Sequence, residues 1–312
     1  MMEHIVMISQ AIILIAISPL MTGIIRKIKA SYQGKVGSSI FQPYRDLAKL
    51  FRKGRLTGKD HTWLFKAIPY MCLASMIILS LMVPFIYVGI LSPFGDLITL
   101  VYLFTLFRFA MVLGGLEGGS VFGGMGSSRE MMMSVLIEPA LLLSIMALSV
   151  LTGGSTNMSD ISLSICEMGS DALGPTLILA VTSFMMTLLA ENARVPFDNP
   201  ATHLELTMVH EAMILEYSGK KLGMMELSSE IRLTLFMAMI SSMFLPWGIA
   251  TEITPIAILI AIGAVIVKML VIAFVIATIE SVTAKYRLFK TPNLLTISFI
   301  LSLLAMVSVY IL

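Results

Sequence analysis

The stretch PIAILIAIGAVIVKMLVIAFVIATI, residues 255–279, contains a single charged side chain, Lys268. A helix of about 20 apolar residues crosses a hydrocarbon core of about 30 Å, so this stretch predicts a membrane span. The whole chain is 57% hydrophobic and 13% charged, a composition typical of membrane proteins. We therefore expect an all-α integral membrane protein in which residues 1–312 form a single multi-spanning domain. About eight spans are predicted in total, the others being 5–25, 66–91, 97–114, 131–152, 174–190, 231–250 and 293–312.

The basic residues lie on one side of this predicted topology. Of the 21 Lys and Arg residues, all but Arg108 and Lys268 fall within, or at the border of, alternate gaps between the spans. The other gaps and both termini contain none. Basic residues mark the cytoplasmic loops of membrane proteins. We therefore expect a multi-pass protein of the plasma membrane, with both termini outside and the large polar loops in the cytoplasm.

The first predicted cytoplasmic segment, residues 26–61, contains an amphipathic stretch. Between residues 39 and 53, Ile40, Tyr44 and Leu47 recur at helical spacing opposite Arg45 and Lys49. This pattern predicts a short cytoplasmic amphipathic helix. Such a helix could lie on anionic lipid or beneath a soluble partner, and the two interpretations are compatible.

Two other loops are distinctive in composition. Residues 114–126 contain seven glycines but no phosphate-binding motif, which favours a flexible or closely packed loop. Residues 153–173, predicted outside, contain three acidic residues and no basic residue. We expect that outer loop to be solvated surface.

The third cytoplasmic segment, residues 191–219, is the richest in polar side chains. Its prolines interrupt the fifth span and predict the start of a new helix. On a continuous helix, Glu205 and Glu216 would lie about 20° apart on one face, with His203, His210 and Tyr217 opposite.

A metal or redox cofactor is not expected in this chain. The HExxH zinc motif fails because Ile214 stands at the second His position, and no Cys is near. The two cysteines, Cys72 and Cys166, are far apart and form no CxxC pair, which argues against an iron–sulfur cluster. The cofactor and metal expectation is therefore none.

Several ionisable residues fall inside or next to predicted spans. Glu138 lies roughly 12 Å into the fourth span at 1.5 Å per residue. Charges at this depth usually pair or conduct protons. One interpretation is a static ion pair of Glu138 with Arg108 or Lys268. The other is a proton or ion pathway formed by Glu138, Glu191, Glu205, Glu211, Glu216, Lys268 and Arg108.

Two motifs resemble a known family. ENARVPFD at residues 191–198 and QPYRDLAKL at residues 42–50 resemble signatures of the complex I subunit 1/H family. GSSREM at 126–131, followed by Glu138-Pro139, and the run from residue 198 to 219 are more similar to the membrane-anchor subunit of group 4 energy-converting [NiFe] hydrogenases. Here NPATHLEL replaces the acidic run of the respiratory branch, a departure that favours the hydrogenase type over a quinone-binding one.

The resemblance implies a non-redox membrane subunit of an oxidoreductase complex. Such a subunit would anchor a soluble redox arm and couple electron transfer to H⁺ or Na⁺ translocation. The [NiFe] centre and iron–sulfur clusters would be held by other subunits. The implied partners are the hydrogenase large and small subunits, an iron–sulfur subunit, antiporter-like membrane subunits and the lipid bilayer, with no nucleic acid. The alternative is the heel subunit of a complex I-like quinone-reducing oxidoreductase.

A docking platform for the soluble arm is expected on the cytoplasmic side. The polar segments there hold most of the polarity outside the bilayer, and interface energy often concentrates in aromatic and Arg side chains. The candidate docking residues are Tyr44, Arg45, Asp46, Arg129, Glu130, Arg194, Asp198, His203, His210 and Tyr217.

Overall fold

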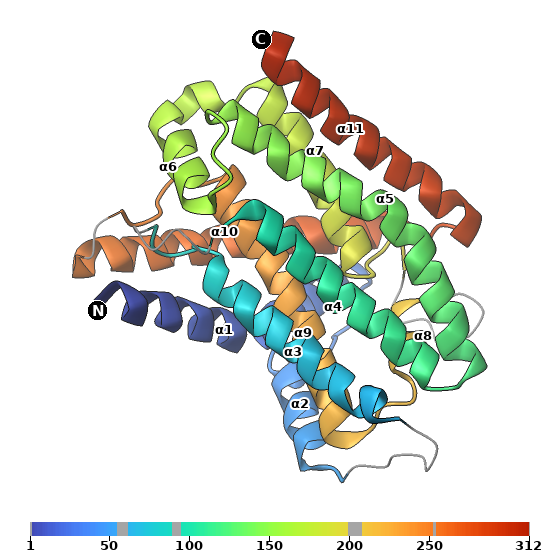
Figure 1. Ribbon diagram of the computed structural model, residues 1–312. Coiled ribbons are helices and arrows are strands. Elements are labelled where there is room, and N and C mark those ends of the chain that lie inside the picture. The colour runs from blue at the N-terminus through green and yellow to red at the C-terminus, as the bar shows by residue number, and fades with distance from the viewer. Residues whose placement is uncertain (1, 55–61, 89–94, 199–207, 252–253, 312) are drawn as a thin grey trace.

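A bundle of long helices forms the protein (Figure 1). The computed structural model describes residues 2–54, 62–88, 95–198, 208–251 and 254–311. Within these ranges, seven helices are long and apolar enough to cross a membrane. They are α1 (Met2–Tyr32), α3 (Trp63–Met82), α4 (Leu97–Glu117), α5 (Val121–Leu151), α9 (Gly219–Met239), α10 (Pro255–Val282) and α11 (Thr291–Ile311). A shorter apolar helix, α7 (Pro175–Glu191), brings the count close to the predicted eight, so the all-α membrane fold is confirmed.

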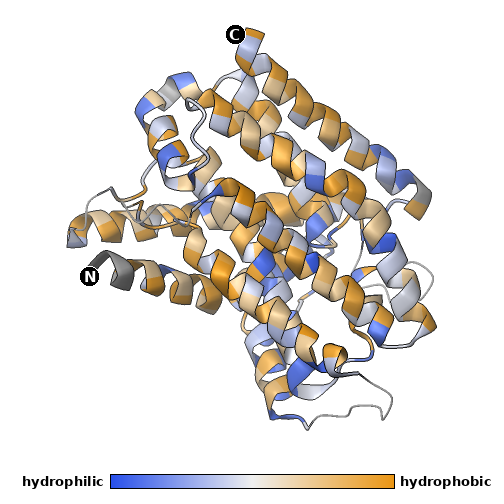
Figure 2. Cartoon of the chain, viewed as in Figure 1, coloured by the Kyte–Doolittle hydropathy of each residue, from blue (hydrophilic) through white to orange (hydrophobic). Residues whose placement is uncertain are grey.

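Helix α9 lies at the centre of the bundle, and 83% of its most apolar window is buried. Around it, α1 packs against α10, and α11 lies along α5 and α7 (Figure 1). Only 28% of the corresponding window of α10 and 22% of that of α11 are buried, so both helices present wide apolar faces outward. Figure 2 shows these apolar faces and the hydrophilic residues that interrupt the middle of the bundle.

The predicted amphipathic helix is present as α2 (Gln42–Arg52). Pro43 and Leu47 are buried, and α2 packs on α1 and α9. The hydroxyl of Tyr44 donates a hydrogen bond to the carbonyl of Ala16 on α1. These contacts fix α2 against two long helices.

The glycine-rich segment is mostly helical, so the prediction of a loop was wrong. Only residues 118–120 separate α4 from α5, and the Ser120 hydroxyl caps α5 by accepting from the Gly123 N–H at 3.1 Å. The glycines instead allow close packing. A Cβ added at Gly126 would lie 2.7 Å from the Val209 carbonyl oxygen.

The segment expected to be a solvated outer loop contains a packed helix, α6 (Met158–Met168). Its apolar face, formed by Met158, Ile161 and Ile165, is fully buried, whereas Asp160 and Glu167 are exposed. Helix α6 packs against η3 (Ile240–Phe244), a π-helical turn that continues α9.

Two spans end in irregular backbone at the end of the bundle nearest α6. After Met82, residues 83–88 leave the helix yet stay mostly buried, and the Gln10 carboxamide oxygen accepts the N–H groups of Phe85, Ile86 and Tyr87 at 3.0–3.3 Å. Among the described residues of the predicted span 66–91, the helix therefore ends at Met82. Non-helical backbone is tolerated at membrane depth only where protein or a cavity satisfies it.

Lys268 of α10 donates hydrogen bonds to the other irregular segment, at the end of α9. Its ammonium donates hydrogen bonds to the carbonyls of Ser241 at 3.3 Å and Leu245 at 2.5 Å. These carbonyls belong to the π-helical turn and to the residue that follows it. A cation is favourable at a helix C-terminus because the carbonyl dipoles there carry partial negative charge.

We expect Lys268→Met to lower the free energy of unfolding by about 1–3 kcal/mol, because it removes the donor to two buried carbonyls. The measurement is unfolding of the detergent-solubilised protein by heat or SDS. Lys66→Met, at an exposed position near the start of α3, is the matched control and should change stability little. Equal stability of the two variants would contradict this role for Lys268.

Candidate functional site

A buried arginine on α4 gathers three carboxylates from two other helices. Arg108 is 4% exposed. Its Nη1 lies 2.9 Å from Glu138 and its Nε lies 3.5 Å from Glu130, both on α5. Its Nη2 forms an ion pair with Glu191, the last residue of α7. The predicted pairing of Glu138 with Arg108 is thus present, as one contact of a larger cluster.

A second buried arginine, Arg232 of α9, completes this buried ion cluster. It is 2% exposed, and its Nη1 lies 3.9 Å from Glu191. Its guanidinium also lies over the ring of Phe107, 4.8 Å from the centroid. We define the buried ion cluster as Arg108, Arg232, Glu130, Glu138 and Glu191. Carboxylates and guanidinium groups in a low-dielectric interior persist only when they are paired in this way.

Sequence reasoning missed Arg232 because it stood at the border of the predicted span 231–250 and was counted as cytoplasmic. The structure begins α9 at Gly219, which places Arg232 more than three turns into the helix. The sequence does contain a signal for this start, because Ser218 is a common N-cap residue and no proline occurs between residues 219 and 245.

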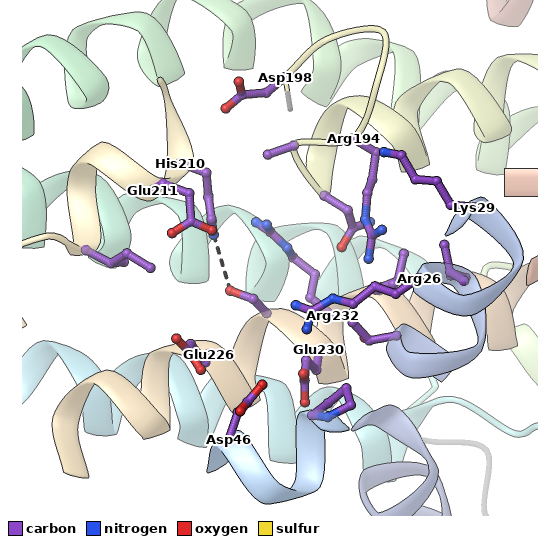
Figure 3. Close-up of a pocket in the computed structure, with 18 of the residues that line it drawn as sticks. Arg26, Lys29, Asp46, Arg194, Asp198, His210, Glu211, Glu226, Glu230 and Arg232 are labelled. Carbon is purple, nitrogen blue, oxygen red and sulfur yellow. Dashed lines mark hydrogen bonds between the residues drawn. The ribbon is translucent and has the colours of Figure 1, made fainter. Parts of the chain in front are cut away.

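Next to the buried ion cluster lies a cavity of about 760 Å³ (Figure 3). Charged side chains from several elements line it. They are Arg26 and Lys29 of α1, Asp46, Lys49 and Lys53 near α2, Arg194 and Asp198 of the turn after α7, Glu211 of α8 (His210–Ile214), Glu226, Glu230 and Arg232 of α9, and Glu280 of α10.

The predicted pathway residues divide into separate groups. Arg108, Glu138 and Glu191 meet in the buried ion cluster, and Glu211 lies in the cavity wall. Glu216 is exposed and is not part of that wall, and Glu205 lies outside the described residues.

Lys268 was expected to share this pathway or to pair with Glu138. Its ammonium instead donates to backbone carbonyls of the π-helical turn, so it belongs to the packing of α9 against α10. Sequence reasoning also missed Glu226 and Glu230. Both residues come after the predicted polar segment 191–219, and the structure places them in the cavity wall.

Two titratable groups in the cavity wall, both outside the spans, have pKa values shifted by burial. Burial, together with the charges of Glu226 and Asp198, raises the pKa of Glu211 to about 7. Burial and the charge of Arg232 lower the pKa of His210 to about 3, so this imidazole stays neutral at physiological pH. The His210 ring lies 3.2 Å from the Ser229 hydroxyl of α9.

Several residues expected to dock the soluble arm are buried within this chain, so their docking role stays a prediction. Glu130 belongs to the buried ion cluster, Tyr217 stacks on Phe65 with ring centroids 4.2 Å apart, and His210 is 8% exposed. Asp198 is 2% exposed and pairs with Lys285 at 2.6 Å. For His210 and Tyr217 the expectation assumed a helix through residues 205–217, whereas the described part of this range is helical only over His210–Ile214.

The other predicted docking residues are more accessible. Arg45 is exposed, while Tyr44, Asp46 and Arg129 are partly buried. Arg129 donates to the Met208 carbonyl at 2.9 Å, and His203 lies outside the described residues. Arg194 pairs with Glu280 at 3.0 Å, and this carboxylate also binds Lys29 at 2.9 Å.

Among the described residues, no group of three or more His, Cys, Asp or Glu side chains is placed to hold a metal ion. The arrangement instead combines fixed guanidinium charges with carboxylates of differing exposure. Such a set can hold, exchange and pass protons.

The fold and the site define a class: a multi-span membrane subunit with an ion cluster inside its bundle and a charged cavity beside it. The sequence profile of the NADH dehydrogenase family matches residues 4–311, and the chain belongs to this family, whose members include membrane subunits of complex I. The resemblance drawn from the two motifs is therefore confirmed.

Two curated relatives come from Escherichia coli strain K12. The chain is 34% identical to hydrogenase-4 component C over 301 residues, which covers 96% of this chain and 93% of that protein. It is also 34% identical to formate hydrogenlyase subunit 4 over 300 residues, covering 96% of each.

A solved structure has the same fold. It is that of the membrane-bound sulfane sulfur reductase, an archaeal respiratory membrane complex. A chain of it superposes with a TM-score of 0.81 and 20% identity, over 97% of this chain and 99% of that one.

The raised pKa of Glu211 predicts a pH-dependent stability. Between its ordinary value of 4.5 and about 7, the folded state binds the Glu211 proton more tightly than the unfolded chain. This carboxyl therefore lowers stability progressively as pH rises through that window. We expect Glu211→Gln to raise the melting temperature near pH 8 and to leave it unchanged near pH 4.5. Glu216→Gln, at an exposed position, is the control. Parallel pH profiles of wild type and Glu211→Gln would contradict the assignment.

Proposed function

We propose that this chain is the membrane subunit of an energy-converting [NiFe] hydrogenase. It anchors the soluble redox subunits and couples their electron transfer to ion translocation. The observation that carries the proposal is the buried ion cluster, in which Arg232 lines a charged cavity and lies 3.9 Å from Glu191. The similarity to hydrogenase-4 component C and formate hydrogenlyase subunit 4 supports the hydrogenase assignment.

The proposed pathway begins in the cavity. Glu211, Glu226 and Glu230 accept protons from the cytoplasm, and Glu191 receives them at the inner end. Glu138, whose side chain is 35% exposed, would pass them on sideways toward neighbouring membrane subunits. A partly exposed carboxylate in a span is costly against lipid, which favours a polar neighbour at this position.

The proposed partners are the hydrogenase large and small subunits and an iron–sulfur subunit on the cytoplasmic side, with antiporter-like subunits in the membrane. Arg45, Tyr44, Asp46 and Arg129 remain docking candidates because they reach the surface. The [NiFe] centre and the iron–sulfur clusters would lie in those soluble subunits.

The alternative is a subunit of a quinone-reducing complex, in which the cavity holds an apolar ring. Ligand sites of that kind are lined predominantly by hydrophobic and aromatic side chains. The wall here is rich in Arg, Lys, Asp and Glu, which favours water and ions. Nickel and hydrogen evolution in the purified complex would support the hydrogenase assignment. A bound quinone without nickel would overturn it.

The proposed orientation has both termini outside and α2 in the cytoplasm. The native Cys166 is exposed on α6 and Cys72 is buried, so the wild-type protein carries its own reporter. We expect a membrane-impermeant maleimide to label Cys166 in intact cells. In a Cys166→Ser background, Lys53→Cys should react only in inside-out vesicles. Labelling of Lys53→Cys in intact cells would reverse the topology.

We expect Glu191→Gln to reduce ion pumping in vesicles by about tenfold or more, since Gln keeps the shape but cannot transfer a proton. Glu138→Gln should act in the same way. Nickel content should stay at the wild-type level in both. The exposed outer carboxylate variant Glu167→Gln is the control and should pump normally.

A normal gradient in both variants at normal turnover would make the cluster a static ion-pair network, which is the other interpretation of these charges.

A further inference from the structure

The cavity and the buried ion cluster meet at one charged side chain. Arg232 lines the cavity, whereas Arg108, Glu130 and Glu191 are not part of its wall. The same guanidinium lies 3.9 Å from the Glu191 carboxylate. An ion that reaches Glu191 from the cavity would therefore stand within a few ångströms of a fixed positive charge.

We propose that Arg232 is the specificity-determining residue of this site and makes Glu191 accept protons while excluding Na⁺ and other metal cations. This inference rests on the proposed role of Glu191 in ion translocation. It adds which ion the cavity delivers to Glu191 and which residue determines that selectivity.

The first argument is electrostatic. Glu191 lies between two guanidinium groups, Arg108 on one carboxylate oxygen and Arg232 near the other. A metal cation bound to Glu191 would stand within a few ångströms of two positive charges and would be strongly repelled, because the interior screens charge poorly.

A proton reaches Glu191 differently. When a hydrated proton transfers, one O–H bond of the hydronium ion breaks, one O–H bond forms on the carboxylate, and neutral water remains. The guanidinium charges disfavour both ions, but the proton forms a covalent O–H bond and needs no coordination shell. A metal cation must keep several oxygen ligands at a carboxylate whose two oxygens already face Arg108 and Arg232.

The second argument is that the barrier is permanent. A guanidinium cannot lose its proton at any physiological pH, so its charge does not vary with conditions. Arg232 is also held in place, with its guanidinium over the Phe107 ring at 4.8 Å and only 2% of the residue exposed. Cation–π contacts of this kind favour Arg at a fixed orientation.

The charged groups around Glu191 come from several elements. The test must change Arg232 alone and leave the other charges in place. Phe107 of α4 and Cys72 of α3 add no charge in their ordinary states. The charged groups are Arg108 of α4, Glu130 and Glu138 of α5, Asp198 of the turn after α7, and Arg232 of α9.

The experiment titrates Glu191 in the intact purified complex by infrared difference spectroscopy. The protonated-carboxyl band of Glu191 is the band that disappears in Glu191→Gln. Its midpoint is measured in choline chloride and in NaCl for wild type, Arg232→Gln, Arg232→Lys and the control Arg287→Gln. Arg287 is exposed after α10 and remote from this contact in sequence.

In wild type the midpoint should be the same in both salts. In Arg232→Gln it should be lower in NaCl than in choline chloride, because the guanidinium that excludes Na⁺ is lost and Na⁺ then competes with the proton. Arg232→Lys should restore insensitivity to Na⁺, and Arg287→Gln should match wild type. A merely structural role would not produce this salt dependence.

An Arg232→Gln midpoint that stays insensitive to Na⁺ overturns the inference, as does a wild-type midpoint that Na⁺ displaces. The proposed function fails by a separate result, normal pumping in Glu191→Gln. The two failures can therefore be told apart. Nickel content and the remaining infrared bands show whether Arg232→Gln has folded. If it has not, the wild-type measurement carries the test, because a midpoint that Na⁺ displaces overturns the inference.

Discussion

The bundle depends on one constraint: a charge buried away from water must be paired with an opposite charge inside the protein. Arg108 meets this constraint by binding carboxylates of α5 and α7, which joins three helices at one point. Arg232 extends the contact to α9. Two guanidinium groups face three carboxylates, so the cluster carries one excess negative charge when every group is ionised. One proton makes it neutral, which gives the cluster two states that differ by a single proton.

Local properties of the chain were sufficient to predict most of the fold. Span positions follow from runs of apolar residues, and α2 follows from helical spacing of its apolar side chains. The pairing of Glu138 with Arg108 was one of two ion pairs that the sequence allowed, because few partners exist for a charge within a span. Each of these inferences needs only composition or spacing along the sequence.

The predictions that failed depended on where helices begin and on which segments of the chain lie in contact. Glu230 was assigned to a loop and Arg232 to the border of a span because the start of α9 was placed too late. The glycines were assigned to a loop because nothing in their spacing indicates that Gly126 packs against the Val209 carbonyl. Helix α6 is different, since Met158, Ile161 and Ile165 recur at helical spacing and could have predicted it.

The family motif at residues 191–198 now has a physical interpretation. Glu191 joins the buried ion cluster, Arg194 binds Glu280 of α10, and Asp198 binds Lys285 just beyond α10. The motif therefore connects the end of α7 to the end of α10 by successive ion pairs. Its charged residues are retained inside the protein by partners that are distant in sequence.

Helix α10 has polar anchors at two depths. At Glu280 it binds Lys29 and Arg194, and at Lys268 it binds the carbonyls of the π-helical turn. Twelve residues separate the two anchors, about 18 Å along a helix that rises 1.5 Å per residue. Between them α10 is one continuous helix whose outward face is apolar. The turn at residues 192–198 and the far end of α9 are therefore both tied to the same helix, although they lie at different depths.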